Sequence, residues 1–157
     1  MTTDASKKVW ENVGVKPVIN GNGHVTVLGG ARLSPRVWQA MEDANPYFVD
    51  MRDLLRSTGE IIAPMVGAEA AFVTSGGSAA LNLATAACIS GDDLEKIERL
   101  PHSEGMKNEV VILNRMKQMG YRYWRCFETA GGRLQWVGSE ENGTVDDMER
   151  AITENTA

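Results

Sequence analysis

The chain has 157 residues, of which 43% are hydrophobic and 24% are charged, and its net charge is −5 at pH 7. This length suffices for one ordinary core, and the composition is typical of a globular domain. The acidic balance argues against a general nucleic-acid binder, and no apolar run approaches the ~20 residues of a membrane span. The N-terminus lacks the apolar core of a signal peptide, and the two cysteines form no C-x-x-C pair. We therefore expect a cytoplasmic protein without a disulfide framework or metal site.

The N-terminal third predicts helices separated by loops. Residues 1–16 are polar and indicate an arm or a short helix, and residues 17–33 are rich in Gly and Asn with an extended piece at 25–28. Ser34 followed by Pro35 is a favourable helix start, because serine caps free amides and proline suits the first helical position. Apolar residues at helical spacing then predict two helices, 34–45 and 50–66.

The most informative stretch is a buried strand at 70–73, a Ser-Gly-Gly-Ser turn at 75–78 and a helix of small residues at 79–90. Such a turn leaves several N–H groups unpaired at a helix start, where the helix dipole adds partial positive charge, so it suits a phosphate. The two glycines allow close approach, and Ser75 and Ser78 can add hydroxyl donors. The pattern is neither a Walker loop nor G-x-G-x-x-G. A tight turn without any ligand is the other interpretation.

The second half continues to alternate between strands and helices. A charged helical turn at 92–99 precedes an irregular loop at 100–106. Thr144 and Asp147 indicate a capping box at a helix start. The remaining segments are strands at 109–113 and 133–137 and helices at 121–129 and 145–153. This alternation predicts a mainly parallel sheet with right-handed crossovers, which is an α/β fold.

The order and spacing of these pieces resemble the selenocysteine-synthase-like branch of pyridoxal-phosphate enzymes. This branch includes L-seryl-tRNA(Sec) selenium transferases and D-glucosaminate-6-phosphate ammonia-lyases, and the ammonia-lyase-like sub-branch is the closer match. The resemblance is weaker at 108–112 and from 137 to the end. The pieces that carry it are 18–20, 26–30, 33–35, 48–51, 67–71 and 74–79.

The resemblance implies a three-layer α/β fold, the incomplete large domain of the aspartate aminotransferase fold (fold type I). Residues 1–33 would be an N-terminal arm and Gly-rich segment, and residues 34–157 the partial cofactor-binding domain. It also implies that Gly76, Gly77 and Ser78 bind the cofactor phosphate, with Ser75 a weaker addition. In this family, the aspartate that pairs with the pyridine nitrogen and the lysine that binds the cofactor covalently lie in a later part. We therefore expect an N-terminal portion that is inactive by itself.

The resemblance further implies a lyase or transferase acting on an amino acid or amino-sugar acid. Its cofactor would be pyridoxal 5'-phosphate, and its reaction would remove the α-proton and eliminate or replace a β-substituent. We expect a homo-oligomer or a missing C-terminal half as partner. The alternative is a non-catalytic interaction fragment, or the remnant of a truncated gene, that associates with a full-length paralogue or a C-terminal partner. Exposed apolar surface is expected in either case.

A few other side chains have both a functional and a plain interpretation. In the resembled family the segment around His24 approaches the neighbouring subunit's active site, but a solvent-facing loop histidine is the simpler expectation, as it is for His102. Lys117 or Gln118 falls where relatives often carry a ring-stacking histidine. Lys107 and Lys117 are interpreted as exposed lysines rather than covalent cofactor sites. We expect the following residues in or near the core: Cys88, Tyr123, Trp124, Cys126 and Phe127.

Overall fold

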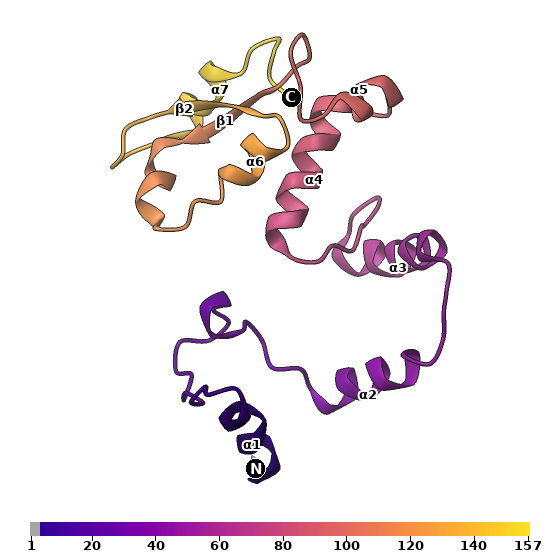
Figure 1. Ribbon diagram of the computed structural model, residues 1–157. Coiled ribbons are helices and arrows are strands. Elements are labelled where there is room, and N and C mark those ends of the chain that lie inside the picture. The colour runs from indigo at the N-terminus through magenta and orange to yellow at the C-terminus, as the bar shows by residue number, and fades with distance from the viewer. Residues whose placement is uncertain (1–3) are drawn as a thin grey trace. The chain divides into compact units, whose positions relative to one another are not determined.

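The computed structural model describes residues 4–157, with side-chain burial described from residue 8 onward (Figure 1). Contacts divide the chain into two units, Met1–Met51 and Arg52–Ala157.

The first unit contains helix α1 (Asp4–Asn12), the 3-10 turn η1 (Thr26–Leu28) and helix α2 (Pro35–Ala44). The predicted helix at 34–45 is confirmed, and its cap is Ser34, whose hydroxyl accepts a hydrogen bond from Val37 N at 3.4 Å. The predicted extended piece at 25–28 is wrong. Leu28 N donates to Val25 O at 3.0 Å, and Gly29 (φ 88°) lets the chain reverse, so the segment closes into a turn.

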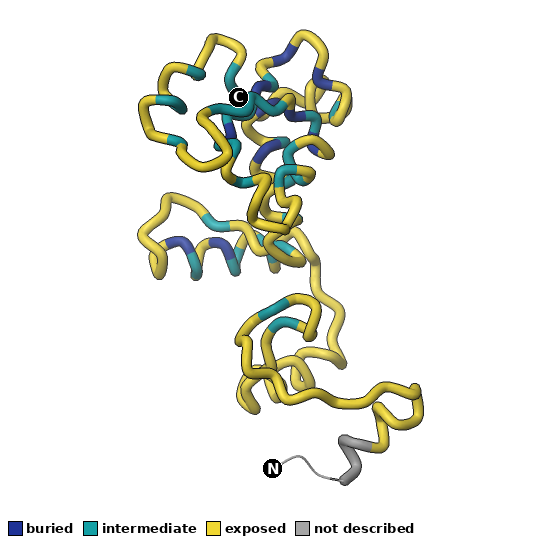
Figure 2. The backbone as a smooth tube through the Cα atoms, turned by 90° about the vertical axis from the view of Figure 1, so that its left-hand side faces the viewer, coloured by how far each residue is buried: buried dark blue, intermediate teal, exposed yellow. Residues whose placement is uncertain are grey.

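The first unit has no core among residues 8–51. Only Val25 and Gly30 are even half-buried, and every other residue of this range is exposed. Figure 2 shows the same contrast, with buried segments only in the second unit. Large side chains are left in solvent, and Ile19 and Phe48 are completely exposed. The expected apolar surface is therefore confirmed for this unit.

The second unit carries most of the regular structure. Its elements are α3 (Met51–Val66, of which the first residue belongs to the first unit), α4 (Gly77–Ser90), α5 (Leu94–Arg99), β1 (Glu109–Leu113), η2 (Asn114–Met119), α6 (Arg125–Thr129), β2 (Arg133–Val137) and α7 (Val145–Ala151). Strands β1 and β2 pair in parallel, with Glu109 opposite Arg133 and Leu113 opposite Val137. The predicted α/β class and parallel pairing are confirmed, as are both predicted strands that form this sheet.

Helices α6 and α7 cover opposite faces of the sheet (Figure 1). A Cβ on Gly132, just after α6, would meet Val110 Cγ2 at 2.9 Å, so Val110 points to the α6 face. A Cβ on Gly143, just before α7, would meet Leu113 Cδ2 at 2.7 Å, so Leu113 points to the α7 face. Side chains of consecutive strand residues alternate between faces, which explains this division.

The core of the second unit is small. Its buried apolar residues are Ala63, Ile89, Met106, Ile112 and Ala130, and no large side chain is completely buried. Helix α4 consists mostly of small and apolar residues without a distinct polar face, a pattern typical of helices enclosed by other layers. Here Leu81 remains 36% exposed and Leu83 48% exposed. The second unit therefore also presents apolar surface that this chain does not cover.

Three sequence predictions in the second unit are wrong. Residues 70–73 form a loop and not a strand, because a strand requires a paired neighbour and β1 and β2 are the only strands in residues 4–157. The helix predicted at 121–129 is limited to α6, and the preceding Tyr121 and Tyr123 lie outside it with their rings stacked on each other. Cys88 and Tyr123, both expected near the core, are exposed.

Candidate functional site

The start of helix α4 holds the residues that the sequence singled out. Gly76 is the helix cap, with φ 158° and ψ 173°, a conformation that residues with a side chain rarely adopt, and Gly77 is the first helical residue. Thr74 Oγ1 donates to Gly76 O at 3.0 Å and lies 3.4 Å from Gly76 N, which holds the turn in shape. Ser75 and Ser78 are exposed beside it. The structure therefore brings Ser75, Gly76, Gly77 and Ser78 together in one exposed turn.

The first amides of α4 are available to a ligand. Ala80 N donates to Gly76 O at 3.0 Å, so regular helical bonding begins only there. Within residues 4–157, the N–H groups of Gly77, Ser78 and Ala79 have no acceptor, and no side chain caps the helix. Unpaired amides at a helix start carry partial positive charge and point along the helix axis. This arrangement can bind an anionic group of the size of a phosphate.

The two glycines leave free space in front of these amides. A Cβ built on Gly76 or on Gly77 would meet no atom within 4 Å. The turn is therefore open, and the space beside the backbone is empty of side chains. This fits a phosphate that approaches the main chain closely. The fit concerns the phosphate group.

The loop that leads to this turn is fixed by a contact that sequence reasoning missed. Gly59 lies buried in the middle of α3, and a Cβ there would come within 2.3 Å of Ala71 O. Only glycine allows the loop to cross α3 so closely. The signal in the sequence was a single glycine inside an apolar helix, which often marks close backbone approach.

The carboxyl ends of β1 and β2 carry a second group of polar and aromatic residues. Asn114 Nδ2 donates to Gly138 O at 2.7 Å and joins the two strand ends. Lys117 Nζ donates to Asn114 Oδ1 at 2.8 Å and lies 4.3 Å from the ring centre of Trp136. The ammonium of Lys117 is thus exposed but held in place, by a hydrogen bond and a cation–π contact. Trp124 meets Trp136 edge-on at 5.5 Å, so Trp124 packs in the structure as expected.

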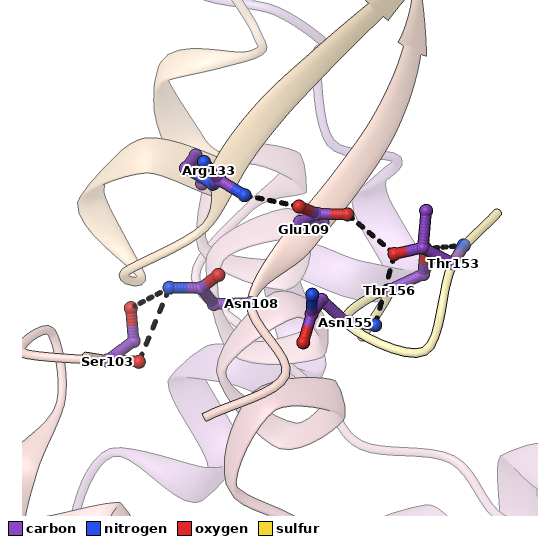
Figure 3. A network of polar contacts seen from close by, with 7 residues as sticks. All are labelled: Ser103, Asn108, Glu109, Arg133, Thr153, Asn155 and Thr156. Carbon is purple, nitrogen blue, oxygen red and sulfur yellow. Dashed lines mark hydrogen bonds and ion pairs between the residues drawn. The ribbon is translucent and has the colours of Figure 1, made fainter. Parts of the chain in front are cut away.

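A buried carboxylate at the other end of β1 forms a network that the sequence did not reveal (Figure 3). Glu109 is only 6% exposed, and its Oε1 pairs with Arg133 Nη2. Thr153 Oγ1 donates to Glu109 Oε2 at 2.8 Å. Both carboxylate oxygens therefore have partners, which burial of a charge requires. The network has a structural explanation and joins β1, β2 and residues 153–157.

The other side chains that the sequence analysis considered are two histidines, one lysine and two cysteines. His24, His102 and Lys107 are exposed, as expected. Cys88 and Cys126 are free thiols. Within the described residues, no three His, Cys, Asp or Glu side chains gather in a way that could hold a metal ion. No helix between residues 4 and 157 is long and apolar enough to cross a membrane.

Comparisons with known proteins identify several relatives of this chain. No family model matches the chain. It is 37% identical over 150 residues to the D-glucosaminate-6-phosphate ammonia lyase of Salmonella typhimurium, covering 95% of this chain and 41% of that protein. It is 32% identical over 150 residues to a 5'-C-glycyluridine monooxygenase-decarboxylase of Streptomyces, covering 94% of this chain and 38% of that protein. It is 27% identical over 153 residues to the L-seryl-tRNA(Sec) selenium transferase of Carboxydothermus hydrogenoformans, covering 88% and 29%.

The fold agrees with these relatives. A solved structure of D-glucosaminate-6-phosphate ammonia-lyase matches with a TM-score of 0.88 and 36% identity, covering 100% of this chain and 42% of that one. The fold and the turn at α4 thus define the class as a partial aspartate aminotransferase-like α/β domain. The chain belongs to a family of pyridoxal-phosphate enzymes and corresponds to an N-terminal portion of such an enzyme. The family includes D-glucosaminate-6-phosphate ammonia lyase and L-seryl-tRNA(Sec) selenium transferase. The chain spans about two fifths of the length of the ammonia lyase.

Proposed function

We propose that this chain supplies the phosphate cradle of a pyridoxal-phosphate-dependent lyase or transferase. The cradle consists of Ser75, Gly76, Gly77 and Ser78. The observation that carries the proposal is the set of three unpaired amides at the open start of α4, in a fold shared with an ammonia-lyase. Three amides that converge on one anion give charge-assisted hydrogen bonds, which are among the stronger ones in proteins.

The substrate class proposed for the complete enzyme is an amino acid or amino-sugar acid. When bound, pyridoxal phosphate supplies an electron-withdrawing ring that stabilises the charge left after loss of the substrate's α-proton, and a β-substituent can then leave or be replaced. The residues of this chain would bind the phosphate and so fix where the cofactor sits. Residues 1–33 would serve as an arm and residues 34–157 as the cofactor-binding portion. Lys107 and Lys117 would take no part in the chemistry.

The cradle is tested by removing one of its backbone N–H groups. Gly77→Pro removes one N–H at the first helical position, where proline is well tolerated, and Gly77→Ala is the matched control that keeps the N–H. We expect the Pro variant to bind pyridoxal 5'-phosphate about 10- to 150-fold more weakly, since a hydrogen bond to a charged group contributes about 1.5–3 kcal/mol. Pyridoxal without the phosphate should show no difference between the two variants. Equal affinity of both variants for the phosphorylated cofactor would refute the cradle.

The role of the lysines is tested separately. Borohydride reduction after addition of the cofactor, followed by mass spectrometry, locates any covalent adduct. We expect no stoichiometric adduct on the wild-type chain. A site-specific adduct on Lys107 or Lys117 would show that this chain carries its own catalytic lysine, and would overturn that part of the proposal.

The second candidate function is non-catalytic association with a full-length paralogue or a C-terminal partner. It is favoured by the first unit, whose apolar side chains, such as Ile19 and Phe48, have no cover among the described residues. Sedimentation of the purified chain, alone and with a full-length relative, tests this candidate. We expect self-association alone and a mixed complex with the relative. A clean monomer in both experiments would exclude it.

A further inference from the structure

Positive charge is concentrated in the segment that follows β1. The 3-10 turn η2 begins directly after this strand, at its carboxyl end, and in open α/β sheets ligands bind outside the carboxyl ends of the strands. The protein as a whole has a net charge of −5, yet no Asp or Glu occurs between residues 114 and 127. The basic residues of this segment are Arg115, Lys117, Arg122 and Arg125.

These four basic side chains are available to a ligand. All of them are exposed, and within residues 4–157 none of them forms an ion pair. Glu140 and Glu141, in the loop after β2, are also exposed and pair with no cation among the described residues. The cations are therefore not neutralised within the chain, and their summed field attracts anions.

The ammonium of Lys117 is fixed by two contacts. Nζ donates to Asn114 Oδ1 at 2.8 Å and lies 4.3 Å from the ring centre of Trp136. Asn114 is fixed in turn by its hydrogen bond to Gly138 O at 2.7 Å. A long side chain loses rotamer freedom when it binds a ligand, and here part of this loss has already occurred on folding. The ammonium has three N–H donors and Asn114 takes one, so donors remain for an anion.

Trp136 brings the two parts of this segment together. Its ring is contacted by Lys117 from η2 and, edge-on at 5.5 Å, by Trp124, which directly precedes α6. Cations from both sides of Gly120 therefore belong to one structure organised around an aromatic ring. Apolar or aromatic surface with a few fixed polar groups is typical of sites for organic ligands. The arrangement suits an anionic group attached to a carbon chain better than a bare inorganic ion.

We propose that Lys117, held by Asn114 and Trp136, binds the anionic oxygens of the substrate, carried by a phosphate or a carboxylate on a sugar-like carbon chain. This inference rests on the proposed function and gives the amino-sugar acid a point of attachment besides the cofactor. The role is binding alone: the ammonium donates hydrogen bonds and forms no covalent bond. The three neighbouring arginines raise the local positive potential, which favours the arrival of an anion.

The affinity test uses three sugars that differ in charge: glucose 6-phosphate, gluconate and neutral glucose. Equilibrium dialysis is carried out on the full chain with Gly77→Pro, which weakens the cradle. We expect the charged sugars to bind at millimolar concentration and glucose not to bind. Tighter binding of glucose 6-phosphate identifies phosphate as the ligand group, tighter binding of gluconate identifies a carboxylate, and equal affinities show that either group is accepted. Equal binding of all three sugars, or binding of none, overturns the proposal.

The residue is tested by Lys117→Gln in the same background. We expect the affinity for the charged sugar to fall about tenfold or more, because a hydrogen bond to a charged group is lost. Lys107→Gln changes an exposed lysine outside this segment and should leave the affinity within about twofold. Equal affinities of the two variants would contradict the assignment. Cofactor affinity of Gly77→Pro tests the cradle and sugar affinity of Lys117→Gln tests this site, so either proposal can fail while the other holds.

Acetylation by a succinimidyl ester gives a local measurement at Lys117 in the wild-type chain. The lysine amine attacks the ester carbonyl, and N-hydroxysuccinimide leaves. Mass spectrometry gives the ratio of the acetylation rates at Lys117 and Lys107. We expect a charged sugar to lower this ratio several-fold and glucose to leave it unchanged. A ratio that the charged sugars do not change would show that the anion binds elsewhere, and would overturn the proposal.

Discussion

Helices α2 and α7 both begin at a capped residue, yet they lie in very different surroundings. Ser34 caps α2, and every residue of that helix is exposed. Thr144 caps α7, which contacts β1 and β2. Met148 and Ala151 of this helix are half-buried. The comparison shows that a cap defines where a helix begins but not whether the helix is packed against other elements. Most helical stability in proteins comes from packing one face against other elements.

The largest expected change in the free energy of unfolding comes from removing a core side chain of the second unit. Ile112→Ala removes part of a side chain that is only 7% exposed and leaves a cavity in a small core. We expect the free energy of unfolding to fall by about 2–5 kcal/mol. Urea unfolding followed by circular dichroism measures it. Val37→Ala on α2, where the side chain is 45% exposed, is the control and should change it by no more than about 0.5 kcal/mol. Equal losses would mean that α2 is packed as tightly as β1.

A smaller loss is expected from Gly59→Ala. The added Cβ would lie 2.3 Å from Ala71 O, so the loop before α4 must move away from α3. Overpacking of this kind costs about 1–3 kcal/mol. The control Gly77→Ala adds a Cβ that meets nothing within 4 Å and should be neutral or slightly stabilising in the same unfolding assay. If both alanines are tolerated equally, the contact between α3 and the loop is not a constraint.

The caps themselves should matter only where a helix is packed. Thr144→Ala removes a hydroxyl that accepts from Asp147 N at 3.1 Å, and we expect a loss of about 0.5–2 kcal/mol. Ser34→Ala removes the corresponding cap of α2 and should leave the cooperative unfolding transition of the second unit where it is. Thermal unfolding of both variants checks the difference. A shift of the same size for Ser34→Ala would show that α2 unfolds together with the second unit.

The smallest effect is a pH dependence at the same cap. Thr144 N and Thr144 Oγ1 donate to the carboxylate of Asp147 at 3.0 and 2.8 Å, and these bonds lower its pKa below the usual value. Because the folded pKa is below the unfolded value of about 3.9, the stabilisation is complete above the unfolded value and is lost as the pH falls through the folded pKa. The difference in unfolding free energy between wild type and Asp147→Asn should therefore shrink as the pH falls below about 4. A difference that stays constant from pH 6 to 3 would contradict this.

Local signals in the sequence were sufficient for several elements. The Ser-Pro start of α2 and the Thr144–Asp147 box of α7 appear in the structure because a cap involves only neighbouring residues. The apolar residues at 110–113 indicated β1 by their composition. The glycines at 76 and 77 could likewise be placed at a helix start from sequence alone. Their binding role stays a prediction.

Features that depend on distant residues could not be read from the sequence. Residues 70–73 have the composition of a strand, but strand formation depends on a neighbour that residues 4–157 do not provide. The contact of Gly59 with Ala71 and the position of Lys117 over Trp136 each require segments that fold together. Burial of Cys88 was predicted from residue type, yet its exposure depends on which layers cover α4.

The Glu109 network also constrains the order in which contacts can form while the chain is being synthesised. Glu109 leaves the ribosome well before its partner Thr153, which follows 44 residues later. Until then, one carboxylate oxygen lacks its hydroxyl donor and the amide of Glu109 lacks the carbonyl of Asn155. Closing such a long loop carries an entropic cost that must be met before the contact stabilises anything. The nascent chain therefore holds β1 incomplete until almost all of these 157 residues have been made. During that interval the first residue of β1 lacks these partners, and unpaired strand edges of this kind favour aggregation.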